Sequence, residues 1–198
     1  RHKGNIGIDA IRFGGGMGNI QRFGETSGMP RALEGARYYC QWAGAPYSVY
    51  SDKGGENDYG DDINARSLMT NWLGGGSCYM PTVNGLCVPF ELALAIHSDA
   101  GYHTDGKSIY GSLAIATTNF NEGMLSAGVS RNVSFELASR LLNNINNDMT
   151  REFGVWGKRY LWDRNYSETR LPEIPSAIIE TLSHQSFPDM KIGQHPLG

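Results

Sequence analysis

The sequence predicts an α/β protein, a three-layer sandwich with a mostly parallel central sheet. Apolar, strand-like runs alternate with amphipathic helical segments along the whole chain, and no internal repeat interrupts the pattern. Two of the runs, 90–101 and 174–184, are continuously apolar before they end, which is typical of strands covered on both faces. The 198 residues suit one core, so 1–198 is expected to form a single domain.

The first half of the chain predicts two strands and two helices. In order, these are a strand at 6–13, a helix from Ser27 to Gly44, a strand at 46–51 and a helix at 63–73. A glycine-rich loop follows the first strand. Thr26 or Ser27 can cap the first helix and Pro30 suits its first turn. Gly44 is expected to end it.

The second half predicts three strands and one long helix. They lie at 90–101, 108–118 and 174–184 for the strands and at 130–154 for the helix. The helix is amphipathic, and Gly154 is expected to end it. Strands of such a sheet place ligand sites in the crevice beyond their carboxyl ends.

The composition describes a globular protein with few constraints on its partners. Of its residues, 40% are hydrophobic and 19% are charged, and the net charge of -3 gives no electrostatic reason to expect nucleic acid or an anionic membrane as a partner. No apolar run is long enough to span a membrane. The 26 glycines and 10 tyrosines are typical of secreted or periplasmic proteins that face carbohydrate. Because the chain opens on Arg1 without a leader, we expect a processed piece of a larger secreted protein, with neighbouring domains.

The three cysteines specify neither a disulfide framework nor a metal cluster. Cys40 falls in a predicted helix and is expected to be a small buried residue. Cys78 and Cys87 can pair across a loop.

Two predicted strands end on polar side chains that can do chemistry. Ile96 gives way to His97, and Ile179 gives way to Glu180, with His184 following in the next loop. A single histidine at a strand end is often a hydrogen-bonded structural residue. A carboxylate at the edge of a core costs several kcal/mol unless a cation, a metal or hydrogen bonds meet it.

These strand ends resemble motifs of the zinc-dependent N-acetylmuramoyl-L-alanine amidases. "LALAIHSDAG" is similar to the family's apolar strand that runs into a histidine, and "IPSAIIETLSHQSFPDM" resembles its closing strand with a catalytic glutamate. The spacing of Arg66 and Asn71 in "ARSLMTN" repeats that of the family. "GETSGMPRALEGARYYCQWAGA" resembles the segment in which a metal-binding glutamate opens a helix, which places that glutamate at Glu25.

The resemblance implies an amidase-like catalytic domain with one zinc ion. In the family, two histidines and one glutamate hold the zinc and leave a position for water, which the metal makes more acidic. By position, His97 and Glu25 are the implied metal ligands. Glu180 is the implied general base and acid, which passes a proton to the departing amine. Peptidoglycan or a related glycan is the implied substrate, and a secreted or periplasmic location follows from it.

The chain departs from the family pattern at two places. Gly15 stands where the family has its first zinc histidine, so the third ligand stays open between His2, His103 and His184. His184 near Glu180 is expected to bind substrate or metal, or to hydrogen-bond within its own loop.

One further segment is expected to border the cleft. In "RNYSETR", Arg164 or Arg170 can hold a substrate carboxylate, with a surface salt bridge as the alternative.

Two functions follow from these observations. The first is a zinc-dependent amide hydrolase that acts on peptidoglycan. The second is a diverged amidase-like domain without zinc, which binds glycan or serves as a module of a larger secreted protein. Gly15 favours the second, whereas His97 and Glu180 favour the first.

Overall fold

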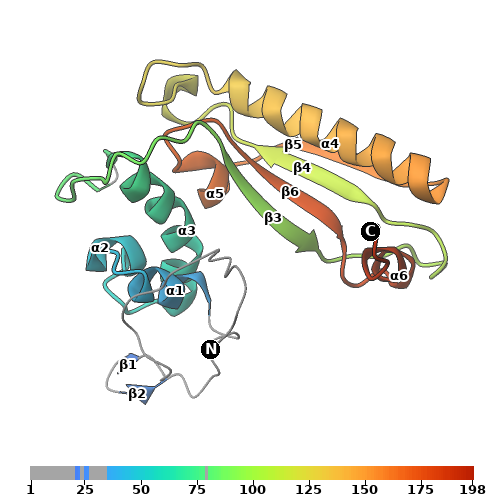
Figure 1. The fold of residues 1–198 in the computed structure, drawn as a ribbon, viewed down its shortest axis with the longest axis horizontal. Coiled ribbons are helices and arrows are strands. Elements are labelled where there is room, and N and C mark those ends of the chain that lie inside the picture. The colour runs from blue at the N-terminus through green and yellow to red at the C-terminus, as the bar shows by residue number, and fades with distance from the viewer. Residues whose placement is uncertain (1–20, 23–24, 27–34, 79) are drawn as a thin grey trace, which may run out of the picture.

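The computed structural model describes residues 21–22, 25–26, 35–78 and 80–198. The predicted strand at 6–13, the glycine-rich loop and residues 27–34 lie outside these residues. The first described helix begins at Ala36 with Gly35 as its N-cap, so the predicted start at Ser27 with a cap at Thr26 or Ser27 is wrong for this helix. Within the described residues, a four-stranded sheet is flanked by helices, which confirms the predicted α/β class (Figure 1).

The central sheet has the strand order β3-β6-β4-β5. Its strands are β3 (Ala93–Asp99), β4 (Ser112–Ala116), β5 (Lys158–Asp163) and β6 (Ser176–Ser183). The pairs β3–β6 and β4–β5 are parallel, and β4 runs antiparallel to β6. The strands predicted around β3, β4 and β6 are confirmed, whereas β5 was not predicted. Because β3 and β6 are parallel neighbours, their carboxyl ends meet at one edge of the sheet.

A long helix covers one face of the sheet. Helix α4 (Asn132–Phe153) packs Ala138 and Leu142 against Ala114 and Ile179 of the strands. Small side chains on both surfaces let the helix and the sheet approach closely. The helix ends at Gly154, whose φ of 82° lies in the left-handed region, as its sequence predicts.

The other face carries a short helix and part of a helical group. Helix α3 (Asp58–Gly74) contacts α5 (Ser167–Arg170), and α5 contacts β6. Two short helices, α1 (Ala36–Trp42) and α2 (Tyr47–Tyr50), pack on α3 on its side away from the sheet (Figure 1). Cys40 lies in the core of this group, and burial raises the pKa of its thiol to about 11.

The remaining described elements are short. They are β1 (Gln21–Arg22), β2 (Glu25–Thr26), a 3-10 helix at Asn121–Gly123 and α6 (Phe187–Gly193). Strands β1 and β2 pair antiparallel. Cys78 and Cys87 are exposed free thiols in this structure. No helix among the described residues is long and apolar enough to cross a membrane.

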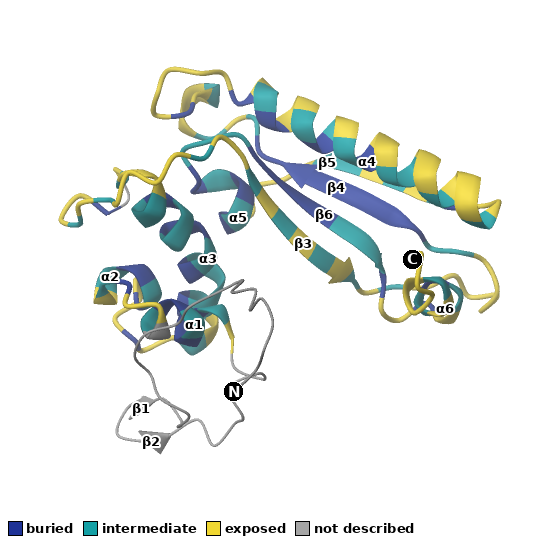
Figure 2. Ribbon diagram, viewed as in Figure 1, coloured by how far each residue is buried: buried dark blue, intermediate teal, exposed yellow. Residues whose placement is uncertain are grey.

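Two predictions of local structure are wrong. The segment predicted as a strand at 46–51 forms α2, because Pro46 starts a helical turn that buries Val49 against the helical group. The strand predicted to be covered on both faces, β3, lies at the end of the described sheet. It alternates between half-buried and exposed residues, and Ile96 is 71% exposed (Figure 2). Helix α4 packs mainly on β4, β5 and β6.

Candidate functional site

His97 and Glu180 lie side by side at the carboxyl ends of β3 and β6. The two residues are direct partners in the parallel register. His97 Nδ1 is 3.9 Å from Glu180 Oε1, which is beyond hydrogen-bonding distance but close enough for a strong electrostatic interaction. The sequence motifs thus meet on one face of the sheet, opposite to α4.

A third residue, Glu168 of α5, holds the other nitrogen of the imidazole. His97 Nε2 lies 3.0 Å and 3.2 Å from the two carboxylate oxygens of Glu168. In the neutral imidazole, a proton on Nε2 that is donated to Glu168 leaves the lone pair on Nδ1. The hydrogen bond therefore turns the unprotonated Nδ1, with its lone pair, toward Glu180.

Helix α3 fixes the position of Glu168. Ser67 Oγ donates to the carbonyl of Ser167 at 2.9 Å, and Asn71 Nδ2 donates to the carbonyl of Leu171 at 2.9 Å. The amide of Glu173 in turn donates to Asn71 Oδ1 at 3.1 Å. These bonds bracket α5 on both sides, so the amide of Asn71 has a structural role in aiming the carboxylate at His97.

An ion-pair chain continues from Glu168 into α3. Arg66 donates to Glu168 Oε2 at 3.2 Å and to Asp62 Oδ2 at 3.0 Å. Asp62 also accepts a hydrogen bond from the backbone of Arg37 at 2.9 Å. Positive and negative groups alternate from Asp62 to Glu180, which orients every member of the chain.

This arrangement shifts the pKa values of the three central groups. The hydrogen bond to Glu168 raises the pKa of His97 above 6.5, although burial opposes it. Burial pushes the pKa of Glu168 upward, but the hydrogen bond and the charges of His97 and Arg66 outweigh it and hold that pKa below 4.5. Both shifts favour the charged pair of imidazolium and carboxylate in the metal-free protein.

Glu180 is in a different environment. Burial raises its pKa above 4.5, and the charge of Asp99 adds to the rise while His97 and Arg159 oppose it. Its Oε2 atom is buried and has no hydrogen-bond partner within the described residues. An unpartnered buried carboxylate oxygen is costly, and such groups concentrate at sites where a ligand or a proton is expected.

Strand β5, which contains an irregularity, places Arg159 on the same face. Ser112 pairs with Lys158 but Ala114 pairs with Leu161, so β5 has one more residue than β4 between these pairs. Lys158 reaches Asn143 of α4, and Leu161 packs with the α4 side of the sheet. Arg159, directly after Lys158, lies on the other side by ordinary alternation, where NH1 donates to Asp99 Oδ2 at 2.6 Å, and the extra residue returns Leu161 to the α4 side.

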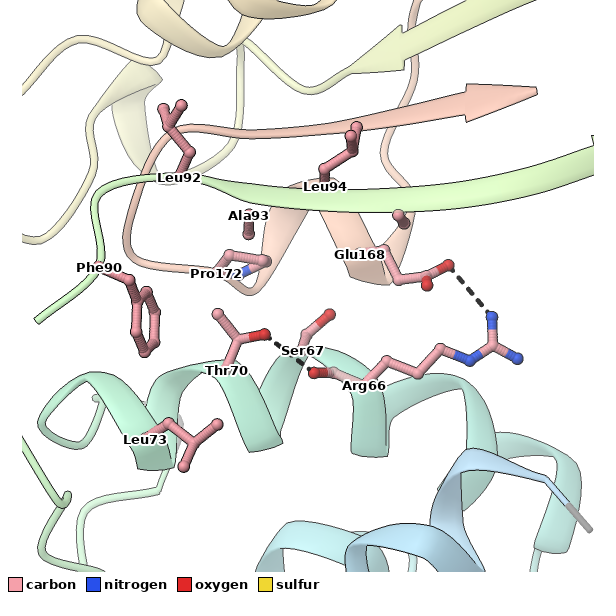
Figure 3. A pocket seen from close by; sticks show the side chains of 11 residues that line it. Arg66, Ser67, Thr70, Leu73, Phe90, Leu92, Ala93, Leu94, Glu168 and Pro172 are labelled. Carbon is pink, nitrogen blue, oxygen red and sulfur yellow. Dashed lines mark hydrogen bonds and ion pairs between the residues drawn. The ribbon is translucent and has the colours of Figure 1, made fainter. Parts of the chain in front are cut away.

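Two adjoining cavities lie next to His97. One, of about 420 Å³, is lined by Arg66, Ala95, Ile96, His97, Ser98 and Glu168. The other, of about 350 Å³, runs between α3 and β3 and shares Arg66, Ala95 and Glu168 with the first. Figure 3 shows Phe90 and Leu73 at its apolar end and the Arg66–Glu168 pair at its polar end. The site is therefore an open cleft whose charge is concentrated near the imidazole.

The other predicted site residues lie around this cleft or away from it. His184 is exposed, with Nδ1 3.1 Å from Ser98 Oγ, and its backbone amide donates to Asp99. His103 packs edge-on against Tyr110. Arg170 pairs with Asn165 and lies over the ring of Phe120 rather than in the two cavities near His97. Arg164 lies over the ring of Trp162.

The zinc site implied by the sequence motifs would include His97. The described residues contain no group of three His, Cys, Asp or Glu residues arranged to hold a metal ion. His97 nevertheless contacts the carboxylate of Glu168 through Nε2, as zinc-binding histidines commonly contact a carboxylate, and Nδ1 is the nitrogen left to bind a metal. Glu25 belongs to β2, but its side chain lies outside the described part, as do His2 and Gly15. His97 therefore has the surroundings of a zinc ligand, whereas neither His103 nor His184 completes a three-residue group with it among the described residues.

Sequence reasoning missed Glu168 and Arg159. Glu168 lies in the polar "RNYSETR" segment, in which only the arginines were considered. Its proximity to His97 depends on bonds to α3, about 100 residues earlier in the chain, and no local pattern encodes them. Arg159 lies on β5, a strand that the sequence analysis does not predict.

Comparisons with known proteins give one weak structural neighbour. No family model matches the chain, and no curated protein matches its sequence. The fold is similar to the crystal structure of N-acetylmuramoyl-L-alanine amidase from Clostridium difficile 630, with a TM-score of 0.41 and 14% sequence identity. The match covers 73% of this chain and 66% of that one.

Proposed function

We propose that this protein is an amide hydrolase of the cell-wall amidase type, which uses zinc and acts on peptidoglycan. The single observation that carries the proposal is the pairing of His97 and Glu180 at neighbouring strand ends, with Glu168 on the far side of the imidazole. The resemblance of both strand motifs to those of the zinc-dependent amidases supports the same reaction. A secreted or periplasmic location is part of the proposal, because peptidoglycan is found there.

Glu180 would act as the proton carrier of the reaction. Because its pKa is raised, the carboxylate of Glu180 accepts a proton more readily than that of an exposed glutamate, and it can then return the proton. It would take a proton from the attacking water and deliver it to the nitrogen of the departing amine. Its buried oxygen without a partner is the atom best placed to hold that proton in between.

His97 and its partners would form the binding half of the site. Glu168 holds Nε2 and Arg66 holds Glu168, so the ring cannot turn away from the cleft. Zinc held by His97, with Glu25 as the second ligand implied by the resemblance, would polarise the amide carbonyl and make water more acidic. The positive charge of Arg66 at the cleft also suits a carboxylate of a peptide stem.

The proposal is tested by Glu180→Gln, which keeps the size of the side chain and removes the proton acceptor. We expect hydrolysis of soluble muramoyl peptides to fall by roughly a hundredfold or more, because general acid–base catalysis is worth about that much. Release of the stem peptide is followed by chromatography, at equal zinc content. Glu136→Gln, on the exposed side of α4, is the matched control and should retain full activity.

Two results would contradict the proposal. Equal activity of wild-type and Glu180→Gln protein would remove Glu180 from the reaction. If the wild-type protein binds muramoyl peptides without cleaving them and retains no zinc on purification, the diverged glycan-binding module becomes the better assignment. Gly15, in place of the family's histidine, is the observation that favours this alternative.

A further inference from the structure

A small pocket lies beyond the strand ends that carry His97 and Glu180. Its volume is about 110 Å³, and its lining includes Tyr102, His103, Ser108, Gln185 and Phe187. Tyr102 and Gln185 each lie five residues after one of the two strand-end residues. The pocket is thus formed by the two loops that leave the candidate site.

The loops are held together firmly, so the pocket is preformed. The backbone amide of His184 donates to the carbonyl of Asp99 at 3.0 Å, and Ser183 Oγ donates to the carbonyl of Gly101. The fully buried carboxylate of Asp189 accepts from the amides of Tyr110 at 2.7 Å and Ser183 at 3.0 Å. These bonds join the end of β6 to the segment before β4.

The pocket differs from the cleft at His97 in its charge. None of the residues lining it is Asp, Glu, Lys or Arg, whereas the cleft contains Arg66 and Glu168. Ser108 donates its hydroxyl proton to Asp105, which leaves its oxygen free to accept a hydrogen bond. Gln185 offers both an amide donor and an acceptor. The lining therefore suits an uncharged polar group that carries an N–H and a carbonyl.

Two exposed aromatic rings stand at the pocket. Phe187 is 77% exposed and Tyr102 is 61% exposed, so both rings are accessible to a ligand at the mouth of the pocket. The pocket is small against the ~300 Å³ of sites that enclose a whole ligand, so it accepts a substituent while the body of the ligand remains outside. A sugar ring that bears an acetamido group combines a flat apolar face with such a substituent.

We propose that this pocket is a sugar subsite, in which an acetamido group of an N-acetylated hexosamine enters between Ser108 and Gln185 and the sugar ring rests on Tyr102 or Phe187. The subsite rests on the proposed function, because it requires a glycan substrate. It divides the substrate-binding region into two parts. The neutral glycan lies beyond the strand ends, and the charged peptide stem lies in the cleft near Arg66.

The probe is tri-N-acetylchitotriose, which has acetamido sugars but no peptide stem, so its binding is independent of amide hydrolysis. We expect binding by calorimetry or by chemical-shift changes, and cellotriose, which lacks the acetamido groups, should bind at least about tenfold more weakly. Tyr102→Ala and Phe187→Ala should each weaken chitotriose binding by about tenfold, as is common for a stacked aromatic anchor. Tyr59→Ala, a 79% exposed tyrosine on α3, is the matched control and should bind normally.

Three results would overturn the subsite. They are the absence of chitotriose binding to the folded wild-type protein, equal binding of cellotriose, and unchanged binding by both Tyr102→Ala and Phe187→Ala. Stem-peptide hydrolysis separates this from the proposed function. If Phe187→Ala and wild-type protein cleave muramoyl peptides with the same KM, the subsite fails while the amidase stands. Chitotriose binding without any hydrolysis leaves the subsite and removes the amidase.

Discussion

The two faces of β6 show how one strand can serve stability and chemistry at once. On the face toward α4, Ala177 and Ile179 are buried with Leu142 of that helix. On the opposite face, Ile178 is buried, but the next residue on that side is Glu180, beside His97. The apolar pattern continues on one face and stops on the other.

The difference separates packing from function within a single element. The α4 face is closed by a helix and gains free energy from burial. The other face, at the strand ends, holds a carboxylate oxygen without a partner within the described residues, which costs free energy in the absence of a ligand. Substitutions on the α4 face should therefore lower the stability of the protein. Removal of the carboxylate on the other face should raise stability and abolish activity.

The largest expected effect is a loss of stability when the packing between α4 and the sheet is disrupted. Leu142→Ala should lower the free energy of unfolding by about 2–5 kcal/mol, because it leaves a cavity between α4 and the sheet. Urea denaturation measures the loss. Phe135→Ala, on the same helix but 38% exposed, is the control and should lose much less. Equal losses in both variants would mean that Leu142 is not a core residue.

The second prediction concerns Glu168, which holds the imidazole of His97 on the open face of the sheet. Glu168→Gln should reduce zinc affinity about 10- to 100-fold, since the second-shell carboxylate orients the histidine and makes it a better donor. Competition with a chromophoric chelator measures the affinity, and His97→Ala should abolish stoichiometric zinc. Unchanged zinc affinity in both variants would place the metal elsewhere.

The third prediction concerns a substitution at Glu180 that should raise stability, whereas Leu142→Ala lowers it. Glu180→Leu should raise the free energy of unfolding of the metal-free protein by about 0.5–2 kcal/mol while it abolishes hydrolysis, as substitutions at costly functional positions often do. Thermal and urea unfolding measure the gain. A loss of stability would show that the carboxylate contributes to the fold as well as to the site.

The smallest effect concerns pH, in the metal-free protein. Glu168 of α5, Glu180 of β6 and Arg66 of α3 face His97, and their net effect raises its pKa above 6.5. The stabilisation from a raised histidine pKa is fully present below 6.5 and is lost as the pH rises through the folded value. The stabilisation from Glu168 is present above 4.5 and is lost as the pH falls through its lowered pKa.

The wild-type protein should therefore exceed Glu168→Gln in stability most clearly between these two limits, and NMR titration should show a lower pKa for His97 in the variant. An unchanged histidine pKa would contradict the role of Glu168. Glu136→Gln again provides the control.

Sequence reasoning found the parts of the site that lie on strands. His97 and Glu180 could be singled out because each ends an apolar run, and parallel strands bring such ends together. The exposure of Ile96 could not be predicted, since a continuous apolar run reads the same at the edge of a sheet and at its centre. The prediction of a strand where α2 forms is wrong because the segment is short. Its alternating pattern spans too few residues to distinguish the two-residue period of a strand from the 3.6-residue period of a helix.

The parts that were missed depend on tertiary structure. Glu168 reaches His97 because Ser67 and Asn71 hold α5 in place, and this contact cannot be derived from either segment alone. The zinc-site prediction was argued by resemblance, and the position of Glu25 relative to His97 stays a prediction.

The extra residue in β5 has a consequence for how this site can evolve. Lys158 and Leu161 both point toward α4 although they are three residues apart, because the strand has one surplus residue between them, and Arg159 lies on the opposite face. Loss of Tyr160 would restore a regular alternation and keep Arg159 next to Asp99, whereas loss of Arg159 would restore the same alternation with Tyr160 in its place. A change of one codon in length, without any substitution at the site, could thus remove a cation from the neighbourhood of Glu180. Related chains should be compared at this position by length as well as by residue identity.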